Sequence, residues 1–566
     1  MNKIFKITTP QKHFVLLTLI LIMAFFFRII GLNWDQGQHL HPDERFLTMV
    51  LTDIKLPSSL KNYLDPNVSS LNPYNNDYSF FVYGSFPINI IKILGEIFNF
   101  NSYDQIYLIG RMVTVLLDTL IIILIYLICK NIFNTKVGLI ASYFYSIFVL
   151  PIQLAHFYTV DPFLNFFIAL SFYILVLLKK PSKTLIKVLV LSLFYGIALA
   201  SKISAIYFLP VIFVFFVFYF LKRPFYFLLY GLVFVVATLL SFRFNQPQVF
   251  LNGNYLDWNP NPIFLNNLIE LKSFSIDPYF PPSIQWLKTI PLLFPLKNII
   301  LWGLGLPFGL IFVFSIGYSL YYMFKKNFKD KFYLFTILLW IIFLIIYQGI
   351  QPVTTMRYFL PIYPFIAIIS AFFINYLLTK IQLLHIKKIL VIIFIFLLIY
   401  PLSFISIYFK DHSRVTASKW IYKNISVGST LAYEYWDDSL PLPIKNKNIS
   451  LYQQEEIQVA NKDTKEKMSI INNQLENSNY LILSSNRFYQ PIPKNYNYFP
   501  LMSKYYKSLF DGSLGFQQVA QFTSFPCFPP IGVPLFCFND TNSEEAFTVY
   551  DHPKVIIFQK VSHTDL

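Results

Sequence analysis

Charged residues are scarce in this chain. They make up only 13% of its 566 residues, whereas 55% are hydrophobic and 19% are aromatic. So little charge could not keep a folded chain in solution, and a mean hydropathy of +0.53 excludes a water-soluble protein. Cysteine is also rare, with three residues. Internal repeats and low-complexity linkers are lacking, which excludes a repeat array. The composition instead indicates a polytopic membrane protein.

Apolar runs long enough to cross a bilayer, about 20 residues each, recur along the first part of the chain. They predict eleven membrane-spanning helices, at 14–32, 107–129, 137–155, 162–179, 185–201, 204–221, 225–242, 299–324, 332–350, 358–379 and 389–409. An odd number of spans places the two termini on opposite sides of the membrane.

The basic residues of the membrane part lie mostly on one side of these spans. With the N-terminus inside, Lys and Arg fill the inside loops, and Asp330 is the acid among them. Positive loops resist translocation. We therefore expect a multi-pass protein of the cytoplasmic (plasma) membrane, with the N-terminus inside and the C-terminal domain outside. The net charge of +16 is therefore explained by the basic inside loops. Nucleic acid is not an expected partner.

Three long segments fall outside the membrane in this topology. Residues 33–106 and 243–298 are rich in Pro, Tyr and Trp, which indicates helices lying on the outer leaflet. We divide the chain into a transmembrane domain, 1–410, and an extracytoplasmic soluble α/β domain, 411–566. In the second domain, short apolar runs predict strands at 480–484, 547–550 and 554–558.

The three cysteines have different surroundings. Cys129 lies at the inner end of a span, where it is expected to serve packing alone. Cys527 and Cys537 flank a Pro-rich turn in the outer domain, so an oxidising compartment could join them. The sequence leaves open whether they form a disulfide or stay as free thiols.

The segment 34–45, directly after the first span, carries adjacent carboxylates and two histidines. Asp43 and Glu44 follow His39 and His41. Acidic groups are costly to hold at a membrane interface, and where they occur they usually belong to a functional site. The alternative is an ordinary solvated loop, because Asp-Glu pairs are common.

Further motifs follow in order at the outer ends of predicted helices. They are Tyr83-Gly84-Ser85-Phe86-Pro87 with Gly110-Arg111, His156-Phe157-Tyr158-Thr159-Val160-Asp161-Pro162, the segment from Gly196 to Lys202, and Met356-Arg357-Tyr358-Phe359-Leu360-Pro361-Ile362-Tyr363-Pro364. With the Asp-Glu pair, they resemble the signatures of the lipid-carrier-dependent glycosyltransferases with the GT-C fold, the protein O-mannosyltransferase and aminoarabinose transferase superfamily. The resemblance covers residues 14–410.

This resemblance implies an α-helical, GT-C-like membrane enzyme of the cell envelope, similar to the prokaryotic members. Such an enzyme is a mannosyltransferase-like hexosyl- or pentosyltransferase. It moves a sugar from a polyprenyl-phosphate donor to a hydroxyl of a protein, lipid or glycan on the extracytoplasmic face, with inversion. Its expected partners are the lipid-linked sugar, the hydroxyl acceptor and membrane lipid.

The resemblance also assigns roles to single residues. A sugar leaves its carrier as a lipid phosphate, so the reaction needs a base for the acceptor hydroxyl and cations for the departing dianion. Asp43 is the expected base and Glu44 a supporting acceptor, while Asp161 orients acceptor or sugar, or joins a metal site. Lys202 and Arg357 are expected to bind the phosphate, the alternative being cations that snorkel to the interface.

Two more residues of these motifs, Tyr358 and His156, complete the expected lipid-phosphate site. His41 is the candidate metal ligand, with Asp43 and Asp161, for Mg, Mn or Zn. No tight ligand spacing accompanies it, and the O-mannosyltransferases resemble metal-independent enzymes. The resemblance therefore allows a divalent metal and requires none.

Two other functional classes stay open from the sequence alone. A secondary transporter would place ionisable groups near mid-membrane, whereas those of this chain gather at one interface. A non-catalytic scaffold or receptor would lack the set Asp43, Glu44 and Asp161, which is intact here. Arg111 and Asp118, on one face of the second span, are expected to pack and to anchor loops rather than to catalyse.

Overall fold

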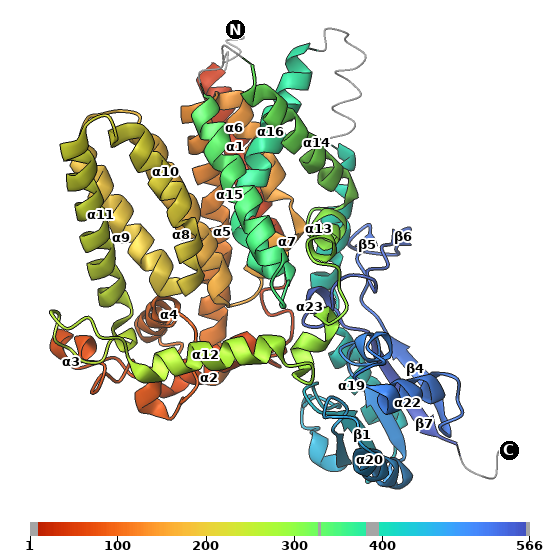
Figure 1. Ribbon diagram of the computed structural model, residues 1–566. Helices are drawn as coiled ribbons and strands as arrows, with labels where there is room; N and C mark the ends of the chain where they lie inside the picture. Colours follow the sequence, from red (N-terminus) through yellow and green to blue (C-terminus); the bar gives the residue numbers. More distant parts are fainter. Residues whose placement is uncertain (1–8, 326–329, 381–394, 562–566) are drawn as a thin grey trace, which may run out of the picture.

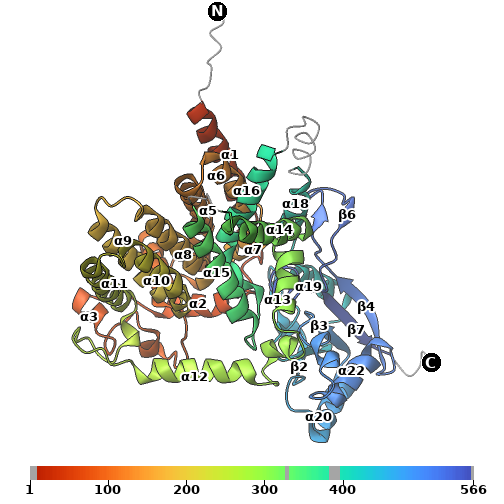
Figure 2. The ribbon, with the colours of Figure 1, turned by 45° about the horizontal axis from the view of Figure 1, so that its top comes forward.

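The computed structural model describes residues 9–325, 330–380 and 395–561. A bundle of long helices forms one part, and a smaller α/β domain lies against its lower right in Figure 1. Several helices cross the lower end of the bundle, opposite the N-terminus. In Figure 2 the longest of these, α12 (Pro262–Ile276), runs beneath the bundle toward the C-terminal domain.

Within the described residues, nine helices are long and apolar enough to span a membrane. They are α1 (Thr9–Ile29), α5 (Tyr103–Ile132), α8 (Val160–Leu177), α9 (Thr184–Ser201), η2 with α10 (Ile203–Phe208 and Leu209–Phe220), α11 (Pro224–Asn245), α14 (Leu306–Met323), α15 (Lys331–Gly349), and η6 with α16 (Met356–Ile362 and Tyr363–Lys380). The prediction of an integral, multi-pass membrane protein is confirmed.

The predicted span 137–155 is broken in the structure. It consists of α6 (Thr135–Ser146) and α7 (Val149–Ala155), which meet at an angle of 60°. Pro151 accounts for the break. Its ring has no N–H to donate and clashes with the carbonyl one turn earlier, at Ile147, so one straight helix cannot pass through both residues.

The predicted span 299–324 is interrupted at Gly305. The short helix η5 (Ile299–Gly303) precedes this residue and α14 follows it. Gly305 has a φ of +82°, and a Cβ atom there would meet the ring of Tyr400 at 2.6 Å. Glycine is therefore required both by the backbone conformation and by the close packing.

The last predicted span, 389–409, is described only in its second half, because residues 389–394 lie outside the described part of the chain. From residue 395 onward it continues into α18 (Ile399–Ile405) and η7 (Ser406–Phe409), which lead into the C-terminal domain.

The two long segments between spans form helices, and those of the first segment together with α12 of the second lie across the lower end of the bundle in Figure 1. The first contains two helices with apolar faces that pack on the bundle, and the second contains α12. The full set is α2 (Pro42–Asp53), α3 (Leu60–Leu64), η1 (Pro73–Asn76), α4 (Ser85–Phe98), η3 (Pro247–Val249), α12, η4 (Pro281–Trp286) and α13 (Leu293–Asn298).

The C-terminal domain is built on a five-stranded sheet in the order β2-β1-β3-β7-β4. Strands β1, β2 and β3 are parallel, and β7 pairs antiparallel with β3 and β4. The elements are α19 (Ser413–Asn424), β1 (Thr430–Glu434), η8 (Ile449–Leu451), β2 (Gln453–Ile457), α20 (Lys465–Asn477), β3 (Tyr480–Leu483), α21 (Pro491–Lys494), α22 (Pro500–Phe510), β4 (Phe516–Phe522) and β7 (Val555–Lys560). The predicted α/β class and two of the three predicted strands are present.

The third predicted strand, at 547–550, is wrong. The segment forms the short helix α23 (Glu545–Thr548) and a turn. Its Phe547 is buried and packs on Phe404 of α18, with ring centroids 5.6 Å apart. The apolar run thus makes the contact with the bundle, and one hydrophobic core continues from the bundle into the sheet domain.

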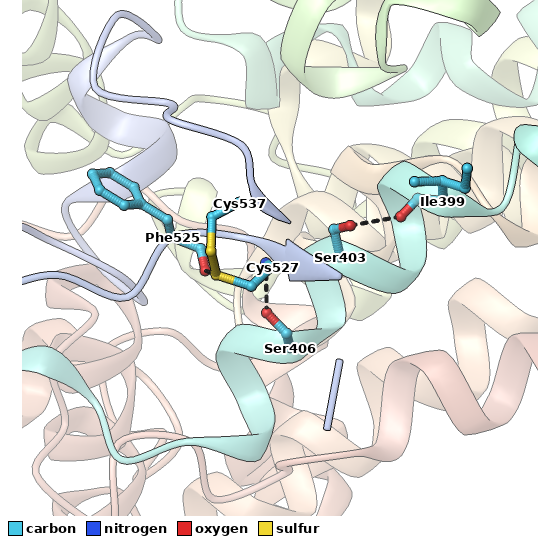
Figure 3. Close-up of a disulfide and its surroundings, with 6 residues drawn as sticks. All are labelled: Ile399, Ser403, Ser406, Phe525, Cys527 and Cys537. Carbon is cyan, nitrogen blue, oxygen red and sulfur yellow. Dashed lines mark hydrogen bonds between the residues drawn. A yellow bond between two sulfur atoms is a disulfide. The ribbon is translucent and has the colours of Figure 1, made fainter. Parts of the chain in front are cut away.

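The two outer cysteines are joined in the structure, which answers the question that the sequence left open. Cys527 lies in β5 (Cys527–Phe528) and Cys537 in β6 (Phe536–Cys537), the two strands of a small separate hairpin. Figure 3 shows the disulfide beside η7, where the backbone N–H of Cys527 donates to the hydroxyl of Ser406 at 2.9 Å. Cys129 is a free thiol and is buried.

Candidate functional site

A cavity of about 370 Å³ opens between the lower ends of the spans and α12. Five of the residues that the sequence predicted for the site line it: Asp43 from α2, Asp161 from α8, Lys202 after α9, and Arg357 and Tyr358 from η6. They are far apart in the chain, and the fold brings them to one end of one cavity.

The start of α2 directs Asp43 into the cavity. His41 is the N-cap and Pro42 takes the first helical position, where its fixed φ and missing N–H are favourable. Asp43 and Glu44 fill the first turn, where carboxylates favour the positive end of the helix dipole. Successive helical residues point about 100° apart. Asp43 therefore faces the cavity while Glu44 faces the bundle.

The carboxylate of Asp43 forms an ion pair with Arg357 and is also hydrogen-bonded by Tyr83. Burial by itself would raise the pKa of Asp43, but the positive charge of Arg357 outweighs it and lowers this pKa to about 2. The carboxylate is consequently ionised at neutral pH. While it remains paired with Arg357, it is a weak base.

A second ion pair lines the same cavity, where the ammonium of Lys202 contacts Asp161 at 2.6 Å. The ring of Tyr358 lies between the two cations, 4.5 Å from Lys202 Nζ and 5.4 Å from the guanidinium carbon of Arg357. The position of Lys202 depends on Gly84. A Cβ atom there would meet the carbonyl oxygens at the end of α9 at 2.1 and 2.3 Å, so only glycine lets α4 start this close to Lys202.

Glu44, which the sequence predicts as a supporting acceptor beside Asp43, does not line the cavity. Its side chain is fully buried and accepts two hydrogen bonds from Arg111 Nε, at 3.0 and 3.1 Å, and one from the backbone N–H of Tyr158 at 2.7 Å. Arg111 also binds Asp35 at 2.9 Å and packs against the ring of Trp34. Glu44 belongs to this buried network, which ties α2 to α5.

His156 and His41 also lie away from the cavity. His156 is fully buried, with its ring nitrogens 2.8 Å from the carbonyl oxygens of Ile152 and Ile30, and it stacks on Tyr408. It anchors α7 to the end of α1 instead of contacting a phosphate. The Nδ1 of His41 accepts the N–H of Glu44 at the start of α2. Burial lowers the pKa of His41 to about 4, so this ring is neutral.

Arg111 and Asp118, which the sequence predicts to pack and to anchor loops, are both buried, but they do not pair with each other. Asp118 accepts from Arg28 at 2.6 Å and from the hydroxyl of Tyr145 at 2.6 Å. Arg111 binds the carboxylates of the network described above. Each of the two long helices α1 and α5 thus carries a buried arginine that is neutralised by its neighbours.

The C-terminal domain reaches the cavity wall, which the sequence did not predict. Glu544 accepts hydrogen bonds from the backbone N–H of Met356 at 3.0 Å and from the hydroxyl of Thr355, directly before Arg357. The ring of Tyr550 lies 4.2 Å from that of His41. Burial raises the pKa of Glu544 to about 7. The domain therefore supports both members of the Asp43–Arg357 pair from behind.

Away from these charges the cavity is apolar. Its walls come from spans α8 and α15, from η2 and from the crossing helix α12, with the side chains Leu164, Ile168, Tyr207, Leu268, Leu271, Trp340 and Leu344. The cavity thus combines a charged end at the lower ends of the spans with a mainly apolar part lined by α8, α15, η2 and α12. A ligand with a charged head and a hydrocarbon tail matches this division.

The chain was compared with known protein families and solved structures. Residues 88–242 match the family model described as dolichyl-phosphate-mannose-protein mannosyltransferase. The matched segment runs from α4 to α11 and contains both Asp161 and Lys202. No curated protein matches the chain.

Solved structures of the oligosaccharyltransferase of Archaeoglobus fulgidus resemble nearly the whole chain. The form tethered to an acceptor peptide with an NVT sequon has a TM-score of 0.55 at 12% identity, over 98% of this chain and 89% of that chain. The complex with an inhibitory peptide and a dolichol-phosphate gives 0.52 at 13%, over 88% and 73%. The complex with Zn and sulfate gives 0.50 at 14%, over 87% and 71%.

The chain has the GT-C fold. The predicted fold class is confirmed by these structures, and the family model confirms the predicted resemblance to GT-C glycosyltransferases that use a lipid carrier. The class of enzyme expected from the sequence, a membrane glycosyltransferase, agrees with both findings. At these identities the structural likeness concerns the GT-C fold, and the roles of single residues rest on the geometry of this chain.

The GT-C neighbour crystallised with Zn raises the question of a metal in this chain. The residues of this chain do not fit a preformed metal centre. In the described part of the chain, no group of three His, Cys, Asp or Glu side chains could hold an ion. Asp43 and Asp161 are each paired with a cation of the protein, and the Nδ1 of His41 is occupied by the cap of α2. Arg357 and Lys202 supply the positive charge at this site.

Proposed function

We propose that this protein transfers a sugar from a polyprenyl-phosphate carrier to a hydroxyl acceptor on the extracytoplasmic side of the plasma membrane. The cavity is the observation that carries the proposal. Two cations and two carboxylates face one another at its charged end, and its apolar walls run on between the spans. The cations suit the phosphate, a carboxylate suits the acceptor proton, and the apolar part suits the prenyl chain.

Binding of the donor would exchange partners within the site. In the resting protein each cation is neutralised by its own carboxylate. A phosphate that enters competes for Arg357, which can hold it with a bidentate fork, and for Lys202, which acts as a point charge. Once Arg357 turns to the phosphate, it no longer lowers the pKa of Asp43, so the donor itself would activate the base.

Transfer then follows as a single displacement. Asp43 takes the proton of the acceptor hydroxyl while the hydroxyl oxygen forms a bond to C1 of the sugar. The bond between C1 and the phosphate oxygen breaks, and its electrons leave with the lipid phosphate, whose charge Arg357 and Lys202 stabilise. Attack opposite the leaving group inverts the configuration at C1. Asp161 is assigned to orient the sugar or acceptor beside Lys202.

For the choice of sugar and acceptor to test, the description of the family model is the guide. Its description names a mannosyltransferase that acts on protein, which makes a mannosyl donor and a protein hydroxyl the first substrates to test. Purified protein in lipid should be incubated with a panel of radiolabelled polyprenyl-phosphate sugars, followed by analysis of which donor is consumed and what becomes labelled. Failure to consume any donor in the panel, with folded protein, would contradict the proposal.

The phosphate contacts predict a selective loss of donor affinity. Arg357→Ala and Lys202→Ala should each weaken binding of the lipid-phosphate sugar by about ten- to a hundredfold, because a charge-assisted contact contributes roughly 1.5–3 kcal/mol. Binding of a fluorescent donor analogue to protein in nanodiscs measures this change. Lys325→Ala, an exposed cation near the end of α14, is the matched control and should bind as the parent does. Parental affinity in both cavity variants would identify these residues as interface anchors.

The proposed orientation predicts which surfaces are accessible from outside the cell. A cysteine in place of the exposed Val427 in the C-terminal domain should react with a membrane-impermeant thiol reagent in intact cells. One in place of the exposed Lys222, between α10 and α11, should react only after lysis. The native thiols add little background, since Cys129 is buried and the other two are joined. The reverse labelling pattern would place the cavity on the cytoplasmic side.

A further inference from the structure

The hairpin that the disulfide closes has an unusually exposed apolar tip. Every residue from 531 to 537 is exposed, and Ile531, Val533 and Leu535 have exposed fractions of 67%, 87% and 79%. The segment 525–538 contains no charged side chain. A cluster of large apolar side chains presented together on a soluble domain indicates contact with a partner or a membrane.

The place of the hairpin in the fold identifies that partner as lipid. The hairpin leaves the sheet domain and packs against α18 and η7, which continue the last predicted span. Cys527 donates to Ser406 of η7, and Phe538 packs edge-on against Tyr400 of α18, with ring centroids 5.2 Å apart. In Figures 1 and 2 the hairpin lies beside the bundle and apart from the sheet.

The neighbouring part of the predicted span is also apolar and exposed. Ile395 and Phe396, just before α18, each have an exposed fraction of 62%. They belong to the run 389–409, which the sequence assigns to the membrane. The hairpin is fixed to the later part of this same run, through Tyr400 and Ser406, so its tip is attached to a segment that the sequence assigns to the membrane.

The backbone of the hairpin is suited to an apolar medium. Groups that cannot bond to water must be satisfied within the protein. Pro526, Pro529, Pro530 and Pro534 have no N–H to satisfy. The N–H of Leu535 donates to Phe528 and that of Phe538 to Pro526, both at 2.8 Å. The arms of the hairpin thus carry few free donors, and the free N–H groups belong to the turn at 531–533.

We propose that the hairpin 528–536 inserts into the outer leaflet of the membrane and anchors the C-terminal domain there. The disulfide closes the hairpin at its base, so the apolar tip is presented as one rigid unit next to η7 (Figure 3). The anchor would hold the domain that carries Glu544 and Tyr550 against the cavity wall. It requires only a membrane, so it does not depend on the proposed sugar transfer.

A fluorescent probe at the tip tests this proposal. An environment-sensitive fluorescent amino acid replaces Val533 in the full-length protein, which leaves the disulfide intact, and the protein is placed one copy per nanodisc of phosphatidylcholine and phosphatidylglycerol. We expect blue-shifted emission that is largely lost when lipids with a spin label near the headgroup are included. The matched control is the same amino acid at Val427, an exposed valine of this domain that lies outside the hairpin, with an exposed fraction of 70%. It should emit as in water and keep its emission.

Each other outcome contradicts the anchor. Emission at position 533 that matches the control would show a tip in water. Blue-shifted emission without quenching by lipid would show that protein, not lipid, covers the tip. A second probe at Ile531 guards against a local failure of the first variant, because both side chains must report the same medium. Cross-linking between copies at higher protein density would identify a second chain as the occupant.

Discussion

Replacement of Asp43 by asparagine is expected to lower turnover by at least ~100-fold. The substitution keeps the size and the hydrogen-bonding shape of the side chain while it removes the base that takes the acceptor proton. Because that proton moves in the transition state, the loss should appear in the rate of the chemical step and not in the binding of the donor. Single-turnover transfer from a labelled donor measures it.

The ion pair with Arg357 makes this prediction sharper. Asp43 competes with the donor phosphate for the guanidinium, so Asp43→Asn should bind the donor as tightly as the parent or more tightly. A merely structural role would weaken both binding and turnover. Asp53→Asn, at the exposed end of the same helix, is the matched control and should keep parental turnover. Near-parental turnover in Asp43→Asn would leave Asp161 as the next candidate, since Glu44 does not reach the cavity.

Much of the fold could be predicted from composition and periodicity. Membrane-spanning helices can be recognised in the sequence because crossing a bilayer requires a long apolar run with few charges. The breaks at Pro151 and Gly305 are local events that a hydropathy window averages away. The run at 547–550 is apolar because it packs on the bundle, and apolar residues at strand length do not reveal which surface they will meet.

The site could be predicted only in part, and the reason lies in side-chain direction. Asp43 and Glu44 are adjacent and chemically alike, and only the start of α2 decides that one faces the cavity and the other faces Arg111. His156 stands in the same motif as Asp161 but points into the bundle. Glu544 and Tyr550 were missed because their contacts cross from one domain to the other.

Replacement of Arg111 by leucine is expected to have the largest effect on stability. Arg111 is fully buried and neutralises both Asp35 and Glu44, so its loss leaves two buried carboxylates without a counter-charge. Removal of one member of a buried ion pair costs about 3–5 kcal/mol. We expect a marked fall in the unfolding temperature in detergent, or protein that fails to accumulate. Loss of Arg45 is the contrast, because its pair with Asp438 is partly exposed and Asp438 keeps a second pair with Arg414, so the expected cost is about 0–1 kcal/mol.

The cost should be reversible if it arises from unpaired charge. A triple variant, Arg111→Leu with Asp35→Asn and Glu44→Gln, removes the two orphaned charges and keeps similar volumes, so it should recover much of the lost unfolding temperature. If Glu44 also took part in transfer, the triple variant would be stable but as slow as Asp43→Asn. Stable protein with near-parental turnover would assign Glu44 wholly to the network that orients α2. No recovery in the triple variant would show that the guanidinium matters through its packing between Trp34 and Tyr107 instead of its charge.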